Sequence, residues 1–480
     1  MTHFPDHGDA QASSPDRGYR DAVAKVEPYG VDHIPDVERH GNPLSQFYVW
    51  FAAGLNFPIM ILGFSAAWFG LSLWQAVTAV VAGAAVGSLL MGGLSRMGVH
   101  LGVAQQMQAR GPLGFVGNML PVAYINVFAG VGWAALTVIL GAKALGELTG
   151  IPFVVSAIGL VAVQLVVAVF GYNMIHFLQK LLSFVLVVLF ALLTAVAIAR
   201  GSTTLEANPD AGGYIGAFGG WLTLFGWFIA FLVAWTPFAS DYSRYLPDDR
   251  AVSLKAGLFT GLGNFLTLSW LGIAGAVVAG AATAVDPIAA VRELTGPWAF
   301  PALLAILLSS FSQNFLNVYG GAISLQTLGI PVNRQQAVVL ICVAAFGVSL
   351  WAEAGVYDKF TVFLNLTAYF IAPYVAVILL DYFVGGRNDK TRIPELFDRR
   401  RILEWGFVAW AIGVLASVPF WQSSLYTGPL ADSIGGGDLS MFVGFAAASA
   451  AYLATYRMPA LWHTKTPVGS ESTPDVTGVS

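Results

Sequence analysis

Residues 309–319 place many polar side chains inside an apolar stretch, in the order Ser-Ser-Phe-Ser-Gln-Asn-Phe-Leu-Asn-Val-Tyr. Amides both donate and accept hydrogen bonds, so Gln313, Asn314 and Asn317 have the chemistry to bind the rim of a small polar molecule. On a helix, Gln313 and Asn317 share a face, while Asn314 lies about 100° round. Such groups are costly in lipid unless they line a cavity or bond neighbouring helices, and both interpretations stay open at this point.

Two tryptophans, Trp133 and Trp235, lie in the middle of long apolar runs. In membrane proteins tryptophan prefers the two interfaces, because its ring is amphipathic. A mid-span tryptophan therefore indicates either ordinary tight packing or the wall of a buried hollow.

The elements that must position these side chains are membrane helices. The 480 residues are 56% hydrophobic and 10% charged, with mean hydropathy +0.69, whereas soluble proteins carry about 25% charged residues. The net charge of −4 and the scattered basic residues argue against nucleic-acid binding. The single Cys342 excludes a disulfide framework and a thiolate metal site. An intramembrane enzyme would need a cluster of His, Cys or carboxylate groups deep in the membrane, and the sequence shows no such cluster.

A membrane-spanning helix needs roughly 20 apolar residues, and the sequence contains twelve runs of this kind. They cover residues 44–70, 73–95, 118–147, 152–171, 176–199, 216–241, 256–281, 298–328, 336–352, 359–383, 403–423 and 438–457. The polar tails 1–43 and 459–480 are expected to be disordered. The first apolar run is too long for a cleavable signal, so none is expected.

The distribution of basic residues predicts the orientation. With twelve spans, the two tails and the loops on their side hold nineteen Lys and Arg residues, whereas the opposite loops hold Arg200, Arg292 and Lys359. Basic loops stay in the cytoplasm. We therefore expect both termini there, in a plasma membrane that would be the inner membrane of a bacterium.

Two predicted helices carry a proline and small or polar residues near mid-span. Residues 51–58 read Phe-Ala-Ala-Gly-Leu-Asn-Phe-Pro, and residues 234–241 read Ala-Trp-Thr-Pro-Phe-Ala-Ser-Asp. The breaks lie five helices apart, and because five is odd, one set of five would be inverted relative to the other. This pattern is typical of inverted-repeat transporters, whose broken helices turn free backbone groups toward substrate and ion. A proline can also merely kink a helix.

The segment 235–247, Trp-Thr-Pro-Phe-Ala-Ser-Asp-Tyr-Ser-Arg-Tyr-Leu-Pro, resembles the nucleobase:cation symporter family, specifically its purine–cytosine permease branch. Weaker likenesses lie at residues 30–39, 132–145, 170–176 and 373–383. The resemblance implies an all-α integral membrane protein of the leucine-transporter type. Residues 44–199 and 216–383 would form a five-plus-five inverted repeat, and two extra helices (403–457) would complete the twelve. It also implies alternating access and a planar heterocycle carried with a proton or sodium ion.

The family stacks its base between aromatic rings of helices 3 and 6. The resemblance implies this role for Trp133 and Trp235, with Phe231 or Phe238 as alternatives in helix 6. Stacking on an aromatic ring is worth roughly 1–3 kcal/mol per base. The helix 6 segment could shift across its break, so the stacking partner stays open.

Rim contacts in the family come from an Asn pair of helix 8, which aligns here with Gln313 and Asn314, near Asn317. Two departures change the rim chemistry. Thr137 stands where the branch often has Asn, and Gln179 stands where it often has Glu. These departures keep open another small heterocycle or ureide, such as allantoin, a hydantoin or a vitamin precursor.

Sodium in this fold lies between the helix 1 break and helix 8. The matching positions are the carbonyls of Gly54, Phe57 and Ser309 and the hydroxyl of Ser312, and hard cations prefer such oxygen ligands. Sodium-coupled relatives usually add a second hydroxyl, which Gln313 replaces here. The sequence contains no carboxylate near the middle of a span, so the choice between H+ and Na+ stays open.

The acids nearest the core lie near helix ends, and two of them have expected roles. Lys143 and Glu147 are spaced i,i+4, so they could neutralise each other. Asp241 either gates the cytoplasmic side or makes a helix-end contact. The resemblance thus implies a transporter that imports a nucleobase, cytosine or a purine, by cation symport. Its expected partners are that small molecule and lipid, without a cofactor, and its oligomeric state is open.

Overall fold

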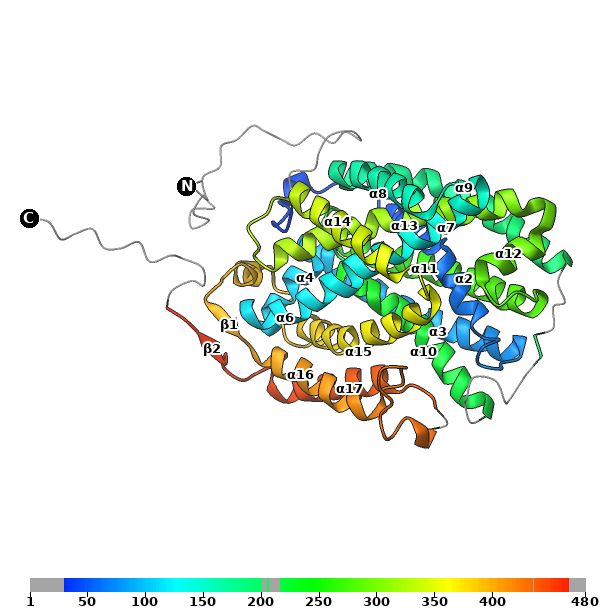
Figure 1. Cartoon of the computed structure of the whole chain (residues 1–480). Helices are drawn as coiled ribbons and strands as arrows, with labels where there is room; N and C mark the ends of the chain where they lie inside the picture. The colour runs from blue at the N-terminus through cyan, green and yellow to red at the C-terminus, as the bar shows by residue number, and fades with distance from the viewer. Residues whose placement is uncertain (1–29, 201–204, 207–215, 435, 466–480) are drawn as a thin grey trace, which may run out of the picture.

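The computed structural model describes residues 30–200, 205–206, 216–434 and 436–465. Within these residues the fold is helical apart from one small two-stranded sheet (Figure 1). The long helices are α3 (Leu73–Leu101), α8 (Phe153–Phe170), α9 (Tyr172–Arg200), α10 (Gly216–Trp235), α11 (Arg250–Ala281), α13 (Ala299–Thr327), α14 (Arg334–Ala352) and α15 (Val356–Phe383).

The shorter helices and the strands complete the described chain. They are α1 (Leu44–Gly54), α2 (Phe57–Phe64), α4 (Gln105–Gln108), α5 (Arg110–Leu113), α6 (Phe115–Ile125), α7 (Trp133–Thr149), α12 (Pro287–Thr295), α16 (Trp405–Ser417), α17 (Ser440–Thr455), β1 (Arg401–Leu403) and β2 (Trp462–His463). A π-helix (Asn126–Gly132) joins α6 to α7. Short 3-10 helices cover Asp36–Glu38, Thr236–Phe238, Gly296–Trp298, Lys390–Leu396, Val418–Phe420 and Asp432–Ile434.

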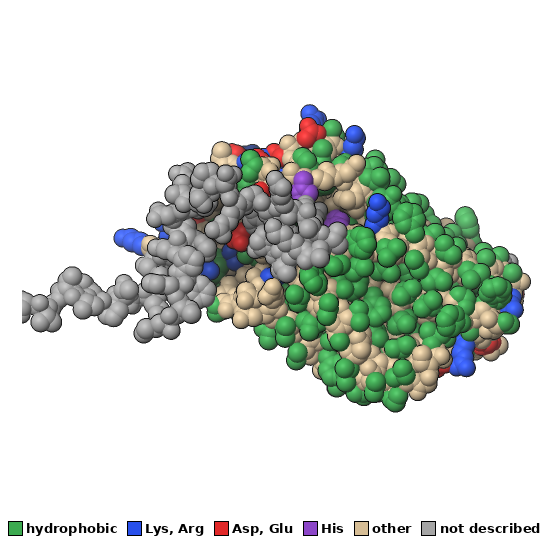
Figure 2. All heavy atoms as spheres, turned by 90° about the horizontal axis from the view of Figure 1, so that it is seen from above, with side chains coloured by type: hydrophobic (Ala, Val, Ile, Leu, Met, Phe, Trp, Pro, Cys, Tyr) green, Lys and Arg blue, Asp and Glu red, His purple; other side chains and the backbone are tan. Residues whose placement is uncertain are grey.

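Nine helices of the described chain are long and apolar enough to cross a membrane, or ten if the bent pair α1–α2 is one span. Two shorter apolar helices, Trp405–Phe420 and Ser440–Thr455, coincide with the last two predicted runs. Large apolar side chains face outward, among them Trp74, Leu89 and Val188, and apolar atoms cover the broad face in Figure 2. The all-helical membrane character is confirmed, while twelve crossings stay a prediction.

Helix 1 is broken where the sequence predicted it. α1 ends at Gly54, α2 begins at Phe57, and their axes differ by 57°. The side chain of Asn56 accepts a hydrogen bond from the backbone N–H of Ile59 at 3.2 Å, so it caps α2 in the way polar side chains cap helix starts. A Cβ on Gly54 would lie 2.0 Å from the Thr267 hydroxyl of α11, so only glycine fits at this bend.

Helix 6 unwinds rather than bends. α10 ends at Trp235, and the chain continues as a single 3-10 turn and further turns to Tyr245. Pro237 has no N–H to offer the carbonyl of Val233, and the Thr236 hydroxyl donates to that carbonyl instead. Residues Phe218–Phe238 remain a single candidate membrane span, and the α-helical hydrogen-bond ladder ends at the expected place.

Two groups of helices pack among themselves. The first joins α1, α2 and α3 around α11, with α10 packed on α3, and the second joins α7, α8, α9 and α14 around α13. α15 packs against α10, α16 and α17. The two groups meet where α1 touches α13, and the candidate site lies at this meeting.

Parts of both tails are ordered, which corrects the expectation of disorder. In the N-terminal segment, Ile34 N–H donates to Gly102 O at 2.9 Å, and the buried Arg39 donates to Val99 O at 3.0 Å, at the end of α3. At the other end of the chain, β2 pairs antiparallel with β1. The remaining residues of the tails lie outside the described chain.

Candidate functional site

Trp133 is the centre of a buried aromatic cluster. Its ring meets Phe231 of α10 at 5.1 Å, Phe363 of α15 at 5.2 Å and Phe360 at 5.7 Å, with interplanar angles of 75–79°. These are the edge-to-face arrangements that aromatic pairs prefer. The cluster therefore brings together side chains from three helices that are distant in sequence.

Trp235 belongs to a neighbouring ring group. The centroid of its indole ring lies 5.9 Å from that of Trp50 and 6.1 Å from that of Phe238. The ring centroids of Trp50 and Tyr242 lie 5.5 Å apart. Of the aromatic side chains considered for helix 6, Phe231 is the one whose ring packs on Trp133. Nothing in the local sequence singles out Trp50, Phe360 or Phe363.

The π-helix Asn126–Gly132 immediately precedes Trp133. Such segments are rare and occur frequently at functional sites. Gly132 allows the close approach, because a Cβ there would lie 2.3 Å from the Phe363 ring. In the sequence, only the dipeptide Gly132-Trp133 pointed to this part of the site. The π-helix itself depends on contacts that the local sequence does not reveal.

The amides of α13 lie beside this cluster. Asn314 Nδ2 donates to the carbonyl of Ala134 at 3.3 Å, and Asn317 Nδ2 donates to Asn314 Oδ1 at 3.1 Å. Both atoms of the Gln313 amide are buried without a hydrogen-bond partner among the described residues, as are Asn317 Oδ1 and the Trp133 indole N–H. An unpaired buried polar group costs about 1–3 kcal/mol. The site thus holds donors and acceptors that a polar ligand can satisfy.

Gln179 of α9 makes a different connection. Its Nε2 donates to the carbonyl of Ser312 at 2.6 Å, and its Oε1 accepts from the Ser312 hydroxyl at 2.6 Å. Both ends of the amide are therefore used between α9 and α13. Thr137 bonds locally, since its hydroxyl lies 3.0 Å from the carbonyls of Trp133 and Ala134.

Of the expected cation positions, Ser312 lies against the helix 1 break. The Ser312 hydroxyl is 2.9 Å from the carbonyl of Ala52, which places α13 directly against the end of α1. The Gly54 carbonyl accepts from Asn56 N–H at 2.9 Å, Phe57 begins α2, and the Ser309 hydroxyl donates within α13 to Ile306 O. The described residues contain no group of three His, Cys, Asp or Glu that could hold a metal.

The acids near the helix ends have protein partners. Asp241, fully buried, accepts from the backbone N–H of Gln105 at 2.9 Å and so ties the end of helix 6 to α4. Glu147 pairs with Arg292. The expected pairing of Glu147 with Lys143 is therefore replaced by a contact between α7 and α12.

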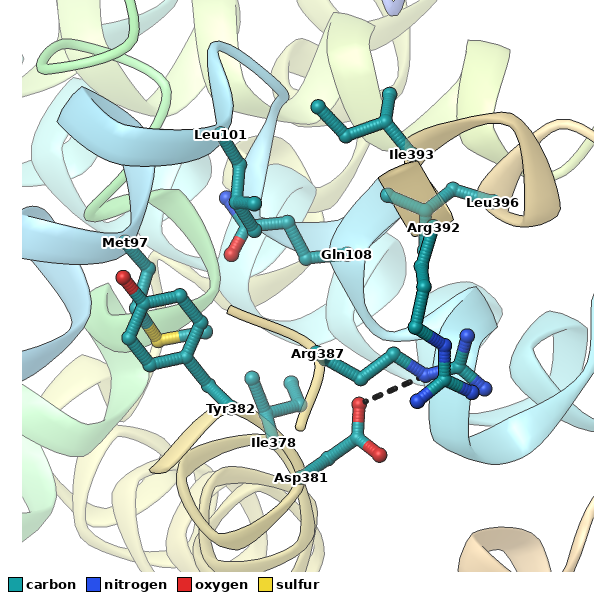
Figure 3. A pocket seen from close by; sticks show the side chains of 10 residues that line it. All are labelled: Met97, Leu101, Gln108, Ile378, Asp381, Tyr382, Arg387, Arg392, Ile393 and Leu396. Atoms are coloured by element: carbon teal, nitrogen blue, oxygen red, sulfur yellow. Dashed lines mark ion pairs between the residues drawn. The ribbon is translucent and has the colours of Figure 1, made fainter. Parts of the chain in front are cut away.

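Figure 3 shows a small cavity at the end of α15, where Asp381 turns toward Arg387. The ion pair measures 3.4 Å, and Tyr452 of α17 donates to Asp381 at 2.6 Å. The cavity measures only about 10 Å³, which is room for about one water molecule. The cavity is too small for a heterocycle. The contacts of Asp381 with Arg387 and Tyr452 join the ends of α15 and α17 to the loop that follows α15.

Three comparisons place the chain. Residues 33–444 match the family described as "Permease for cytosine/purines, uracil, thiamine, allantoin". The chain is 30% identical to "Putative purine-cytosine permease YxlA" of Bacillus subtilis over 89% of this chain and 95% of that protein. It is 25% identical to the hydantoin permease of Microbacterium maritypicum, over 79% of this chain and 80% of that protein.

A solved structure shares the fold. It is Mhp1, a nucleobase-cation-symport-1 family transporter in a closed conformation with bromovinylhydantoin bound. The TM-score is 0.70 at 21% identity, covering 90% of this chain and 97% of that one. The fold is therefore that of the leucine-transporter type, and the chain belongs to the nucleobase:cation symporters, a family of secondary transporters and not of enzymes.

Proposed function

We propose that the protein imports a nucleobase, cytosine or a purine, together with a cation by alternating access. The unpaired Gln313 amide carries the proposal. It offers one donor and one acceptor side by side, the pattern that a ring amide or amidine edge complements. Its neighbour Asn314 bonds the carbonyl directly after Trp133, so the polar rim and the aromatic cluster belong to one site.

The expected roles divide between faces and rim. Trp133 and Phe231 supply aromatic faces, and Trp235, one helical turn after Phe231, adds a ring beside Trp50 at the helix 6 break. Gln313 and Asn317 supply open hydrogen-bonding atoms. Thr137 and Gln179 support the rim through the backbone of α7 and through Ser312 rather than through a free polar group.

The transport cycle follows from the two packing groups. The helices around α11 would rock against those around α13, in a twelve-helix, five-plus-five arrangement with both termini cytoplasmic. The unwound ends of α1 and α10 are the segments that can change shape at low cost. Coupling to an inward cation gradient would make the direction of transport import across a plasma membrane.

The coupled ion is a proton or a sodium ion. The Gly54, Phe57, Ser309 and Ser312 oxygens lie around the helix 1 break and α13, where a sodium ion would find oxygen ligands. Gln313 can offer its Oε1 in addition. Proteoliposome uptake with an imposed sodium gradient or an imposed proton gradient tests this choice directly.

A second substrate class has specific support. One relative is a hydantoin permease, and the solved structure of the same fold contains a hydantoin. The deciding experiment is uptake of labelled cytosine and hypoxanthine in proteoliposomes, with allantoin and hydantoin as competitors. Saturable uptake of a nucleobase supports the proposal, and uptake of hydantoin or allantoin alone replaces the nucleobase as substrate.

A further inference from the structure

A second cavity lies at the far end of α7, about 360 Å³ in volume, between the end of α7, the start of α8 and the start of α12. Pockets that hold small ligands measure about 300–1,000 Å³. Lys143 in its wall comes ten residues after Trp133 on the same helix, which corresponds to about 15 Å along the axis. In Figure 1, α12 lies at the opposite end of the molecule from β1 and β2. Along the chain, α12 lies between the predicted spans 256–281 and 298–328, in a loop that faces the outside when both termini are cytoplasmic.

The carboxylates of this cavity are already engaged. Glu147 pairs with Arg292 of α12. Asp286 accepts hydrogen bonds from the backbone N–H groups of Ile288 and Ala289, both at 2.9 Å, and so caps α12.

Lys143 differs from its neighbours. Its side chain is half-buried and lines the cavity, yet it makes no ion pair or hydrogen bond with any residue that the structure describes. An ammonium group carries three N–H donors, and a ligand oxygen in the cavity would accept a hydrogen bond from it.

The rest of the wall suits a flat ring. Phe153 offers an aromatic side chain and Ile288 an apolar one. We propose that this cavity is an outer binding site for a heterocycle bearing a ring carbonyl, in which Lys143 donates to the carbonyl oxygen and Phe153 packs on the ring. This inference rests on the proposed function, since it assigns the same class of molecule to an entry site.

The position explains how such a site serves transport. α7 connects the cavity rigidly to Trp133, and α12 continues through a 3-10 turn into α13, which carries Gln313. Both walls are thus continuous with the helices of the central site. A heterocycle held here is concentrated at the outer end of the helices between which it must pass.

The test compares Lys143→Gln and the cavity-filling Ala289→Trp with a matched control, Lys359→Gln. Lys359 is also predicted outside, but its ammonium group donates to the Trp351 and Ala354 carbonyls. We expect either change at the cavity to raise the half-saturating concentration of hypoxanthine about tenfold, the effect of one charge-assisted hydrogen bond, with the maximal rate retained. Adenine has no ring carbonyl, so its half-saturating concentration should change little in Lys143→Gln.

A binding measurement separates the two sites. Purified Trp133→Ala protein should keep weak hypoxanthine binding, and the double variant Trp133→Ala/Lys143→Gln should lose it. Unchanged half-saturation in both cavity variants, with uptake intact, overturns the outer site and leaves the proposed function standing. Absence of hypoxanthine, adenine and cytosine uptake by the unaltered protein overturns both.

Discussion

Asn314 of α13 donates to the carbonyl of Ala134, the residue that follows Trp133 on α7, over 3.3 Å. Through this bond the polar stretch of one helix is fixed against the aromatic cluster of another. Asn317 holds the other end of the Asn314 amide, so the orientation of Asn314 is set from both sides. The adjacent Gln313 keeps both amide atoms unpaired.

Removing the central ring should abolish transport. We expect Trp133→Ala to lower nucleobase uptake at least about tenfold, because stacking on an aromatic side chain contributes roughly 1–3 kcal/mol per base. Expression and membrane insertion should persist. Trp74→Ala is the control, since Trp74 is 73% exposed on the outer surface; equal uptake in the two variants would contradict the assignment of Trp133.

The Asn314 bond to α7 should matter as much as the ring. Asn314→Ala removes the contact with the Ala134 carbonyl and frees Asn317 Nδ2, so we expect uptake to be lost in proteoliposomes. Asn314→Asp keeps the acceptor for Asn317 but has no donor for Ala134. Normal transport by the alanine variant would show that this amide only packs helices.

Two glutamines should respond in opposite ways to the same substitution. Gln313→Leu deletes unpaired buried atoms, so we expect uptake to fall while thermal stability in detergent stays equal or rises. Gln179→Leu deletes two hydrogen bonds to Ser312, so stability should fall. A loss of stability in Gln313→Leu as large as in Gln179→Leu would argue that Gln313 is a structural residue.

The cap of α2 should contribute measurably to the helix 1 break. Asn56→Ala removes the acceptor for the Ile59 N–H, and loss of an N-cap costs about 1 kcal/mol. Asn56→Ser keeps a capping oxygen and should retain most of that stability. Thermal unfolding of the two purified variants checks the difference, and identical midpoints would contradict it.

The loop after α15 should show a defined pH dependence. Burial opposes ionisation of Glu395, but hydrogen bonds and charges from Arg392, Arg387 and Arg401 lower the pKa of its carboxyl from 4.5 to about 2. A lowered folded-state pKa stabilises the fold fully above the unfolded value, and this contribution is lost as pH falls toward the folded one.

We therefore expect the unaltered protein to melt at a higher temperature than Glu395→Gln, and we expect this difference to be largest above pH 4.5. The gap should shrink as the pH falls from there toward about 2. A gap that widens on acidification would contradict the assigned direction of the shift.

The fold could be predicted where the signal is local. Asn56 and Pro58 specify the end of one helix and the start of the next, because proline lacks a donor and asparagine caps. The polar stretch of helix 8 likewise marked the candidate site, since amides in an apolar run are costly unless they line a cavity or bond a neighbouring helix. These features depend on residues adjacent in sequence.

What the sequence did not reveal depends on contacts between distant segments. The choice of Phe231 rather than Trp235 as the ring on Trp133 depends on how α10 rotates against α7. The spacing of Lys143 and Glu147 suggested a pair, but Arg292 of α12 lies closer to Glu147. The ordered tail residues were missed because their partners, such as Gly102, are far away in the chain.

The most direct test of the central claim is equilibrium binding of cytosine and hypoxanthine to the purified protein, followed by tryptophan fluorescence and by labelled ligand. We expect saturable binding that quenches fluorescence in the unaltered protein, with the high-affinity phase absent from Trp133→Ala. Binding of full affinity in Trp133→Ala, or no binding of either base to the unaltered protein, would contradict it.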